Sequence, residues 1–121
     1  MKRLILAGAT AVVFGSGANA SDLAGIQIRE LLAGNSIVHP AFGCVYFNPD
    51  GSTLALAGGQ FLVGFWRVEG DLYRSSGNCG SLGCRLSGGF PSTVFRRIDG
   101  GYVQPATVVR GNHCEKNVLV S

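Results

Sequence analysis

Glycine interrupts nearly every apolar run of this sequence after residue 20. Of the 19 glycines, 16 lie in residues 21–121, and several form turn-type pairs such as Asp50-Gly51, Gly58-Gly59 and Asp99-Gly100. Such pairs tolerate the positive φ of tight hairpin turns, whereas glycine in the interior of a helix is destabilising. The pattern disfavours long helices and predicts short strands joined by tight turns.

About seven short strands are expected between these turns, which makes the chain mainly β. The clearest have β-branched, aromatic or alternating apolar residues, and they cover residues 44–47, 52–57, 60–68, 72–74, 92–98 and 102–109. Strands that follow one another through tight turns form an antiparallel meander, which we expect to roll into a half-barrel or small barrel. Because residues 60–68 are apolar on both alternating faces, this strand is expected to be central or covered on its outer face.

One short helix is expected before the strands. Ser21 or Asp22 is a suitable cap, and apolar residues recur at near-helical spacing from Leu23 to Leu32. Gly34-Asn35 suits the C-terminal end of this helix.

The first 20 residues have the three parts of a secretory signal peptide. Lys2 and Arg3 precede an uncharged apolar run at residues 4–14, and Ala18-Asn19-Ala20 is a small-x-small cleavage site. The run of 11 residues is shorter than the roughly 20 that a membrane span needs, so no stable span is expected after cleavage. The expected organisation is a signal peptide at 1–20 and a single β-rich domain at 21–121, located in the periplasm or secreted.

All four cysteines lie after the predicted signal peptide. An even number in a small exported domain predicts disulfides, because a small hydrophobic core alone gives marginal stability. We favour Cys79–Cys84 together with Cys44–Cys114, since Gly80 and Gly83 let the close pair form a small ring. The two other connectivities remain open.

Charge gives no indication of nucleic-acid binding. Without Lys2 and Arg3 the chain has eight basic residues and seven acidic ones, and Arg96-Arg97 is its one remaining basic pair. A nucleic-acid surface requires a basic stripe or patch, so no nucleic-acid partner is expected.

No catalytic constellation is recognisable, and we expect the protein not to be an enzyme. His39 and His113 are the only histidines, and no G-x-S-x-G motif accompanies them. His113 and Cys114 are adjacent, so on a strand they would point to opposite faces, and oxidation would remove the Cys114 nucleophile. The carboxylates that could form a glycosidase pair are all expected at solvated turns; they are Asp50, Glu69, Asp71 and Asp99.

A metal site is also not expected, and neither is a cofactor. Cys79, Cys84, His113 and Cys114 could be drawn as zinc ligands. However, the spacing lacks paired C-x-x-C knuckles, and an exported chain favours disulfides instead.

Aromatic residues are numerous for a domain of this size. If the sheet closes incompletely, part of this surface would line a groove for an apolar ligand, and otherwise it forms the core. The candidate groove residues are Phe47, Phe61, Phe65, Trp66 and Phe95.

Three motifs resemble those of a family of small exported bacterial proteins without an established activity. They are the helix end at residues 31–36 (LLAGNS), the Y-F-x-P-D-G hairpin at residues 46–52, and the G-x-W-x-V-x-G-D strand and turn at residues 64–71. The resemblance covers residues 30–72 and implies a small β-rich exported domain. The family usually has a cysteine just after the G-D turn, where this chain has Leu72-Tyr73.

Gly64-Phe65-Trp66 is also similar to the G-x-W signature of small extracellular barrels, which include lipocalins, avidins and bacterial inhibitors of secreted metalloproteases. In those proteins the motif lies near the start of the chain, and here it lies in the middle. Trp66 is also simply the largest core candidate.

Together these features predict a non-catalytic binding or inhibitory module of the envelope or extracellular space. Its expected partner is a protein, such as a hydrolase, held by an exposed loop at residues 75–91. The alternative is a carrier of a small apolar ligand between helix and sheet.

Overall fold

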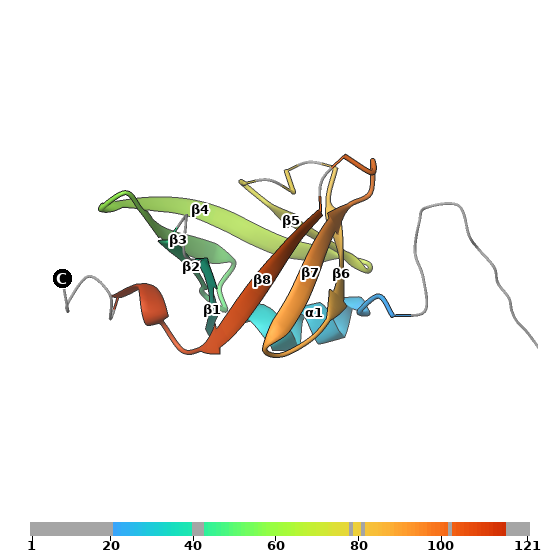
Figure 1. The fold of residues 1–121 in the computed structure, drawn as a ribbon, viewed down its shortest axis with the longest axis horizontal. Coiled ribbons are helices and arrows are strands. Elements are labelled where there is room, and N and C mark those ends of the chain that lie inside the picture. Colours follow the sequence, from blue (N-terminus) through green and yellow to red (C-terminus); the bar gives the residue numbers. More distant parts are fainter. Residues whose placement is uncertain (1–20, 40–42, 78, 81, 102, 116–121) are drawn as a thin grey trace, which may run out of the picture.

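The computed structural model describes residues 21–39, 43–77, 79–80, 82–101 and 103–115, so the predicted signal peptide lies outside the described residues. Eight antiparallel strands in chain order form a closed barrel, in which the last strand pairs with the first (Figure 1). The strands are β1 Asn35–His39, β2 Gly43–Phe47, β3 Ser52–Ala57, β4 Gln60–Glu69, β5 Leu72–Ser75, β6 Cys84–Gly88, β7 Ser92–Arg97 and β8 Val103–Arg110. The helix α1, Gly25–Leu32, precedes them. The prediction of a mainly β, antiparallel barrel with one short N-terminal helix is confirmed.

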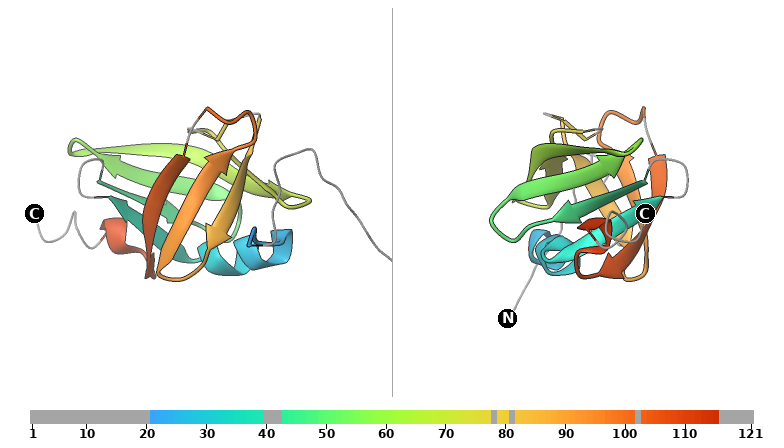
Figure 2. Two further views of the ribbon diagram at one scale, coloured as in Figure 1. Left: turned by 45° about the vertical axis from the view of Figure 1, so that its right-hand side comes forward. Right: turned by 90° about the vertical axis from the view of Figure 1, so that its left-hand side faces the viewer.

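The up-and-down order places successive connections at opposite ends of the barrel (Figure 2). The turns that follow β2, β4 and β6 lie at the end where α1 packs, which we call the helix end. The connections that follow β1, β3, β5 and β7 lie at the other end, which we call the open end. Because strand alternation is strict in a barrel wall, every second residue points inward.

Strand β6 lies in a segment that was expected to be an exposed loop. It pairs with β7 from Cys84, opposite Arg97, to Gly88, opposite Thr93. The side chains of Cys84 and Leu86 are fully buried. The expectation of a loop over residues 75–91 is therefore wrong for this strand. Glycine and serine residues on either side make its alternation of buried and exposed residues difficult to recognise in the sequence. The pairing with β7, which covers all five residues of β6, stabilises the strand.

Strand β4 differs from expectation on its outer face. It has ten residues and packs Trp66 into the core, as its apolar pattern predicts. However, Phe61, Val63 and Phe65 alternate with the inward positions and are exposed. Of the two alternatives expected for this strand, the central position is confirmed, because β4 pairs with β3 on one side and with β5 on the other. A covered outer face is not found, because no other described element packs over this half of the strand.

The helix begins differently from the sequence expectation, but it ends as expected. Its N-cap is Ala24, so neither Ser21 nor Asp22 caps it as expected. Instead, the Gly25 N–H donates to Oδ1 of Asp71 at 2.7 Å, and that carboxylate comes from the turn between β4 and β5. At the other end Gly34 has φ +79°, which suits the expected glycine stop. A tertiary acceptor thus takes the place of an N-cap side chain, while the Gln27 side chain accepts locally from the Ala24 N–H at 2.7 Å.

The core is concentrated at the helix end. Ile28 and Leu32, one helical turn apart, are fully buried against the barrel interior. Phe47 makes an edge-to-face contact with Trp66, with ring centroids 5.6 Å apart. Such pairs add to the energy of area burial. The interior at this end is therefore filled.

Two of the three motifs are held together at the helix end. The indole Nε1 of Trp66 donates to the carbonyl oxygen of Asn48 at 2.8 Å, and the Trp66 N–H donates to that of Gly51 at 2.9 Å. The Y-F-x-P-D-G turn is thus bonded directly to the G-x-W strand. The motifs that carry the family resemblance serve the fold at this end of the barrel.

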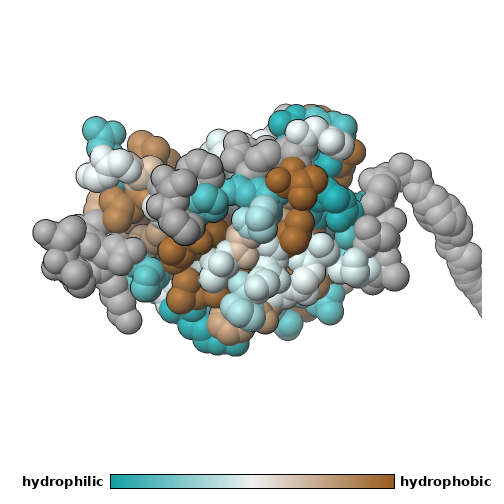
Figure 3. Space-filling model, viewed as in Figure 1, coloured by the Kyte–Doolittle hydropathy of each residue, from teal (hydrophilic) through white to brown (hydrophobic). Residues whose placement is uncertain are grey.

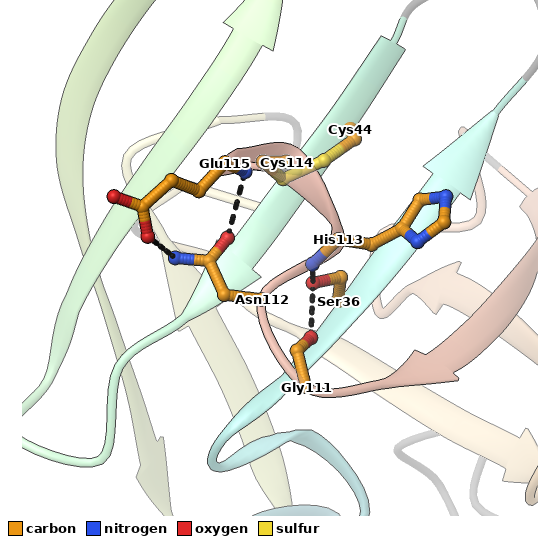
Figure 4. Close-up of a disulfide and its surroundings, with 7 residues drawn as sticks. All are labelled: Ser36, Cys44, Gly111, Asn112, His113, Cys114 and Glu115. Atoms are coloured by element: carbon orange, nitrogen blue, oxygen red, sulfur yellow. Dashed lines mark hydrogen bonds between the residues drawn. A yellow bond between two sulfur atoms is a disulfide. The ribbon is translucent and has the colours of Figure 1, made fainter. Parts of the chain in front are cut away.

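The third motif anchors the chain after β8 (Figure 4). The Ser36 hydroxyl donates to the carbonyl oxygen of Gly111 at 2.6 Å and accepts from the N–H of His113 at 2.9 Å. The Asn35 side chain accepts from the Gly111 N–H and donates to the carbonyl oxygen of Leu31. Residues 35 and 36 therefore tie the helix to the C-terminal turn.

The structure contains the disulfides Cys44–Cys114 and Cys79–Cys84, the pairing favoured from the sequence. The first joins β2 to the turn after β8 across 70 positions of sequence, and the second closes a short loop at the open end. Disulfides of this kind fit an oxidising compartment outside the cytoplasm.

The bond between Asp71 and Gly25 predicts a helix-end variant. Asp71→Ala removes the only side-chain acceptor that the structure shows for the Gly25 N–H, so the free energy of unfolding should fall by about 1 kcal/mol. Asp71→Asn keeps an acceptor oxygen and should lose less. Urea titrations, with Trp66 fluorescence as the signal of unfolding, measure the free energy of unfolding of both variants. Equal losses in the two variants would contradict the capping role.

The two disulfides should differ in their contribution to stability. In the chain-entropy model the wider loop contributes about 4 kcal/mol and the short one about 2 kcal/mol. Cys44→Ala with Cys114→Ala should therefore lower the denaturation midpoint more than Cys79→Ala with Cys84→Ala. Chemical denaturation of the two double variants tests the order, and a reversed order would contradict it.

Candidate functional site

A cavity of about 290 Å³ occupies the open half of the barrel. Its walls come from β1, β2, β3, β5, β7 and β8, and from the start of the loop after β5. Apolar residues dominate the described lining; they include Ile37, Val45, Phe47, Ala55, Tyr73, Phe95 and Ala106. An eight-stranded barrel is just wide enough to be filled by side chains or to hold one small ligand. This barrel is filled by side chains at the helix end and leaves a cavity at the open end.

The size of the inward residues explains why only one end is empty. Near the mouth the lining residues are small, as at Gly43, Ala55 and Ala57. Deeper in the barrel the aromatic rings of Phe47, Tyr73 and Phe95 form the floor. The ring centroids of Phe47 and Tyr73 are 6.1 Å apart, and those of Tyr73 and Phe95 are 5.3 Å apart. The rings contact one another edge to face, so the floor is rigid.

A few polar groups interrupt the apolar wall. Thr53 and Ser75 are buried in it, while Gln104 and His39 line it nearer the rim. The Ser75 Oγ accepts from the Gly77 N–H at 3.2 Å, which leaves its own O–H available as a donor. No aspartate, glutamate, lysine or arginine is among the lining residues that the structure describes. The site therefore suits a neutral, mostly apolar molecule with a hydrogen-bonding group.

The structure brings together only part of the expected groove. Phe47 and Phe95 line the cavity, and Val45 joins them. Trp66 is buried behind Phe47 and does not reach the cavity. Phe61 and Phe65 point outward on β4 and are exposed, so they belong to a different surface. Sequence reasoning could not separate these rings without the register of the strands.

Several lining residues gave no signal in the sequence. Ala55, Ser75 and Ala106 are small and carry no chemistry of their own, so no motif contains them. Their role is to leave space, which only the closed barrel defines. The alternation of small residues along β3, at Thr53, Ala55 and Ala57, is the one indication that the sequence offers.

The candidate catalytic groups are not assembled into a site. Asp50 and Asp71 lie in turns at the helix end, whereas Asp99 lies in the β7–β8 connection at the open end. Glu69 forms ion pairs with Arg67 and Arg74 at 2.8 and 2.6 Å. Each carboxylate therefore has a structural partner.

Two of these carboxylates have a perturbed pKa. The hydroxyl and the N–H of Ser52 both donate to Asp50 and lower its pKa below the usual range. The N–H of Gly101 and the guanidinium of Arg97 do the same for Asp99. Both groups are exposed and close their own turns, so they act as structural anions.

Cys114 is in a disulfide and cannot act as a nucleophile. The three cysteines that could have been drawn as zinc ligands, Cys79, Cys84 and Cys114, are all in disulfides, whereas zinc binds thiolates. Within the part of the chain that the structure describes, no three metal-ligating side chains gather. Over the same residues, no helix has the length and apolarity to cross a membrane.

No protein-family model, curated protein or solved structure matches this chain. The resemblance in the three motifs therefore stays a prediction. The geometry of the barrel cavity is the observation on which a functional proposal can rest.

Proposed function

We propose that the protein is an exported, non-catalytic binding protein that carries a small apolar ligand in the barrel cavity. The observation that supports this most directly is the empty, apolar half of a barrel whose other half is tightly packed. A folded barrel gains stability from filling its interior, so a wall of small residues around an aromatic floor is costly unless something else occupies the space.

The cavity indicates the class of ligand. Its volume of about 290 Å³ lies at the lower end of the range of roughly 300–1,000 Å³ that ligand pockets occupy. A short aliphatic chain or a small ring system fits this space. Because the described lining contains no aspartate, glutamate, lysine or arginine, a neutral ligand such as an aliphatic alcohol is favoured over a fatty-acid anion.

Ala106 offers a direct test, because its side chain lies in the cavity wall on β8. Ala106→Phe should fill part of the cavity and weaken the binding of 1-decanol by about tenfold or more, equivalent to at least about 1.4 kcal/mol. Thr107→Phe is the matched control, since Thr107 is the next residue of the same strand and is exposed. It should bind like the unchanged protein.

Trp66 provides the readout. It is the only tryptophan in the sequence and contacts Phe47, which forms the cavity floor. Saturable changes in its emission should occur with 1-decanol in the unchanged protein and in Thr107→Phe. Circular dichroism confirms that each variant is folded. Flat titrations across a series of neutral alcohols, or equal affinities in the filled and control variants, would contradict the proposal.

A second candidate is a binding or inhibitory module for a protein partner. The observation in its favour is the short loop at the open end, which the Cys79–Cys84 disulfide closes and from which Leu82 is exposed. The N–H of Gly83 donates to the carbonyl oxygen of Cys79 and tightens the loop further. Preorganised loops of this kind lose little entropy on binding.

Native mass spectrometry of the protein purified from its own source separates the two candidates. A small added mass that Ala106→Phe removes supports the carrier. An added protein mass that Leu82→Asp removes, while Ala106→Phe retains it, supports the module. The two substitutions lie in different elements, so each outcome identifies its own site.

A further inference from the structure

One edge of β4 has no partner strand over half of its length. β4 pairs with β3 from Gln60 to Phe65, but its pairing with β5 begins only at Trp66. The β3–β4 hairpin therefore projects beyond β5 (Figure 1). Among the described residues, nothing pairs with residues 60–64 on the side away from β3.

The backbone groups that point to this free edge can be identified. The N–H and C=O groups of Phe65 bond to Ser76, at 3.2 and 3.1 Å, and so point away from β3. In an antiparallel ladder this direction alternates with every residue. The two-residue turn Gly58–Gly59 leads to the same assignment of directions. A turn of this length makes Ala57 and Gln60 a hydrogen-bonded pair, so the groups of Gln60 point toward β3 and those of Phe61 point away from it. Phe61 and Val63 therefore present two N–H and two C=O groups to the free edge.

The side chains along this edge are apolar and accessible. Phe61 is 44% exposed, Leu62 58% and Val63 79%. Figure 3 shows hydrophobic residues at the end of the molecule where Figure 1 places the hairpin tip. Proteins usually protect such edges with lysine, proline, a bulge or an inward charge. Here the register with β3 runs without a bulge, and no charged residue or proline occurs from Gly51 to Trp66.

We propose that this edge of β4 pairs antiparallel with the same edge of a second copy of the chain. In the register that we infer, Leu62 lies on the two-fold axis opposite Leu62 of the second copy. Phe61 then faces Val63 of the second copy, and Val63 faces Phe61 of the second copy. Both pairs are of the type that exchanges two hydrogen bonds, so the four outward groups of each chain are all satisfied.

The observations favour a second copy over other occupants. The exposed backbone groups require a strand, since a bilayer interior would leave them without hydrogen-bond partners. The edge is self-complementary, because it places an aromatic residue against a β-branched one and no like charges against each other. A two-fold arrangement uses the same patch on both copies and leaves this edge of β4 paired in each, so the contact closes at the dimer.

The first test is the mass in solution of the chain without its predicted leader. Analytical ultracentrifugation over a concentration series should show a monomer–dimer equilibrium. Val63→Lys should shift it to the monomer, because pairing would then place two like charges diagonally across the two-fold axis, and an edge lysine opposes strand pairing. Val103→Lys is the matched control, since Val103 is also an exposed strand valine, 61% accessible on β8. It should dimerise like the unchanged protein.

Amide hydrogen exchange tests the register directly. The N–H groups of Phe61 and Val63 should be protected in the dimer and lose protection in Val63→Lys. The Leu62 N–H points toward β3 and should be protected in both proteins, which provides an internal control. A protein that stays monomeric throughout, a Val63→Lys variant that still dimerises, or a monomer that instead binds neutral phosphatidylcholine vesicles would overturn the proposal.

Discussion

The interior of the closed barrel is the constraint on which the rest of this structure depends. Once β1 pairs with β8, the enclosed volume is set by eight strands and has to be filled, left empty or occupied by a ligand. At the helix end, Ile28 and Leu32 of α1 fill it together with Phe47 and Trp66. At the open end, small side chains leave the cavity. The difference between the two ends is a difference in side-chain volume along the same strands.

Tertiary hydrogen bonds connect the filled end into one unit. Asp71 binds the first turn of the helix, and Trp66 binds the turn between β2 and β3. Ser36 binds the segment after β8, which the Cys44–Cys114 disulfide also holds. Every residue of the recognised motifs that makes one of these bonds lies at the helix end. The motifs therefore bear on the fold and give no information about the ligand that we propose for the cavity at the other end.

The β3–β4 hairpin is a part of the barrel wall that extends beyond the neighbouring strand β5. β4 is ten residues long and β5 only four, so the strands cannot pair along their whole length. The unequal lengths leave an uncharged edge of β4 without a partner strand among the described residues. The proposed dimer contact therefore depends on a mismatch in strand length, whereas the cavity depends on side-chain volume.

The sequence by itself determined the class of fold and the positions of most turns, because glycine and aspartate conformations are local properties of the backbone. It also indicated α1 and, through the glycines between them, the pairing of Cys79 with Cys84. It did not reveal β6, whose stability comes from β7, or the cap of α1, which comes from a residue 46 positions away. Only the tertiary structure decided which aromatic residues face inward: Phe47 and Phe95 line the cavity, while Phe61 and Phe65 face solvent. The physical reason is that side-chain direction in a strand alternates with every residue, so it depends on the register with neighbouring strands, which non-local hydrogen bonds define.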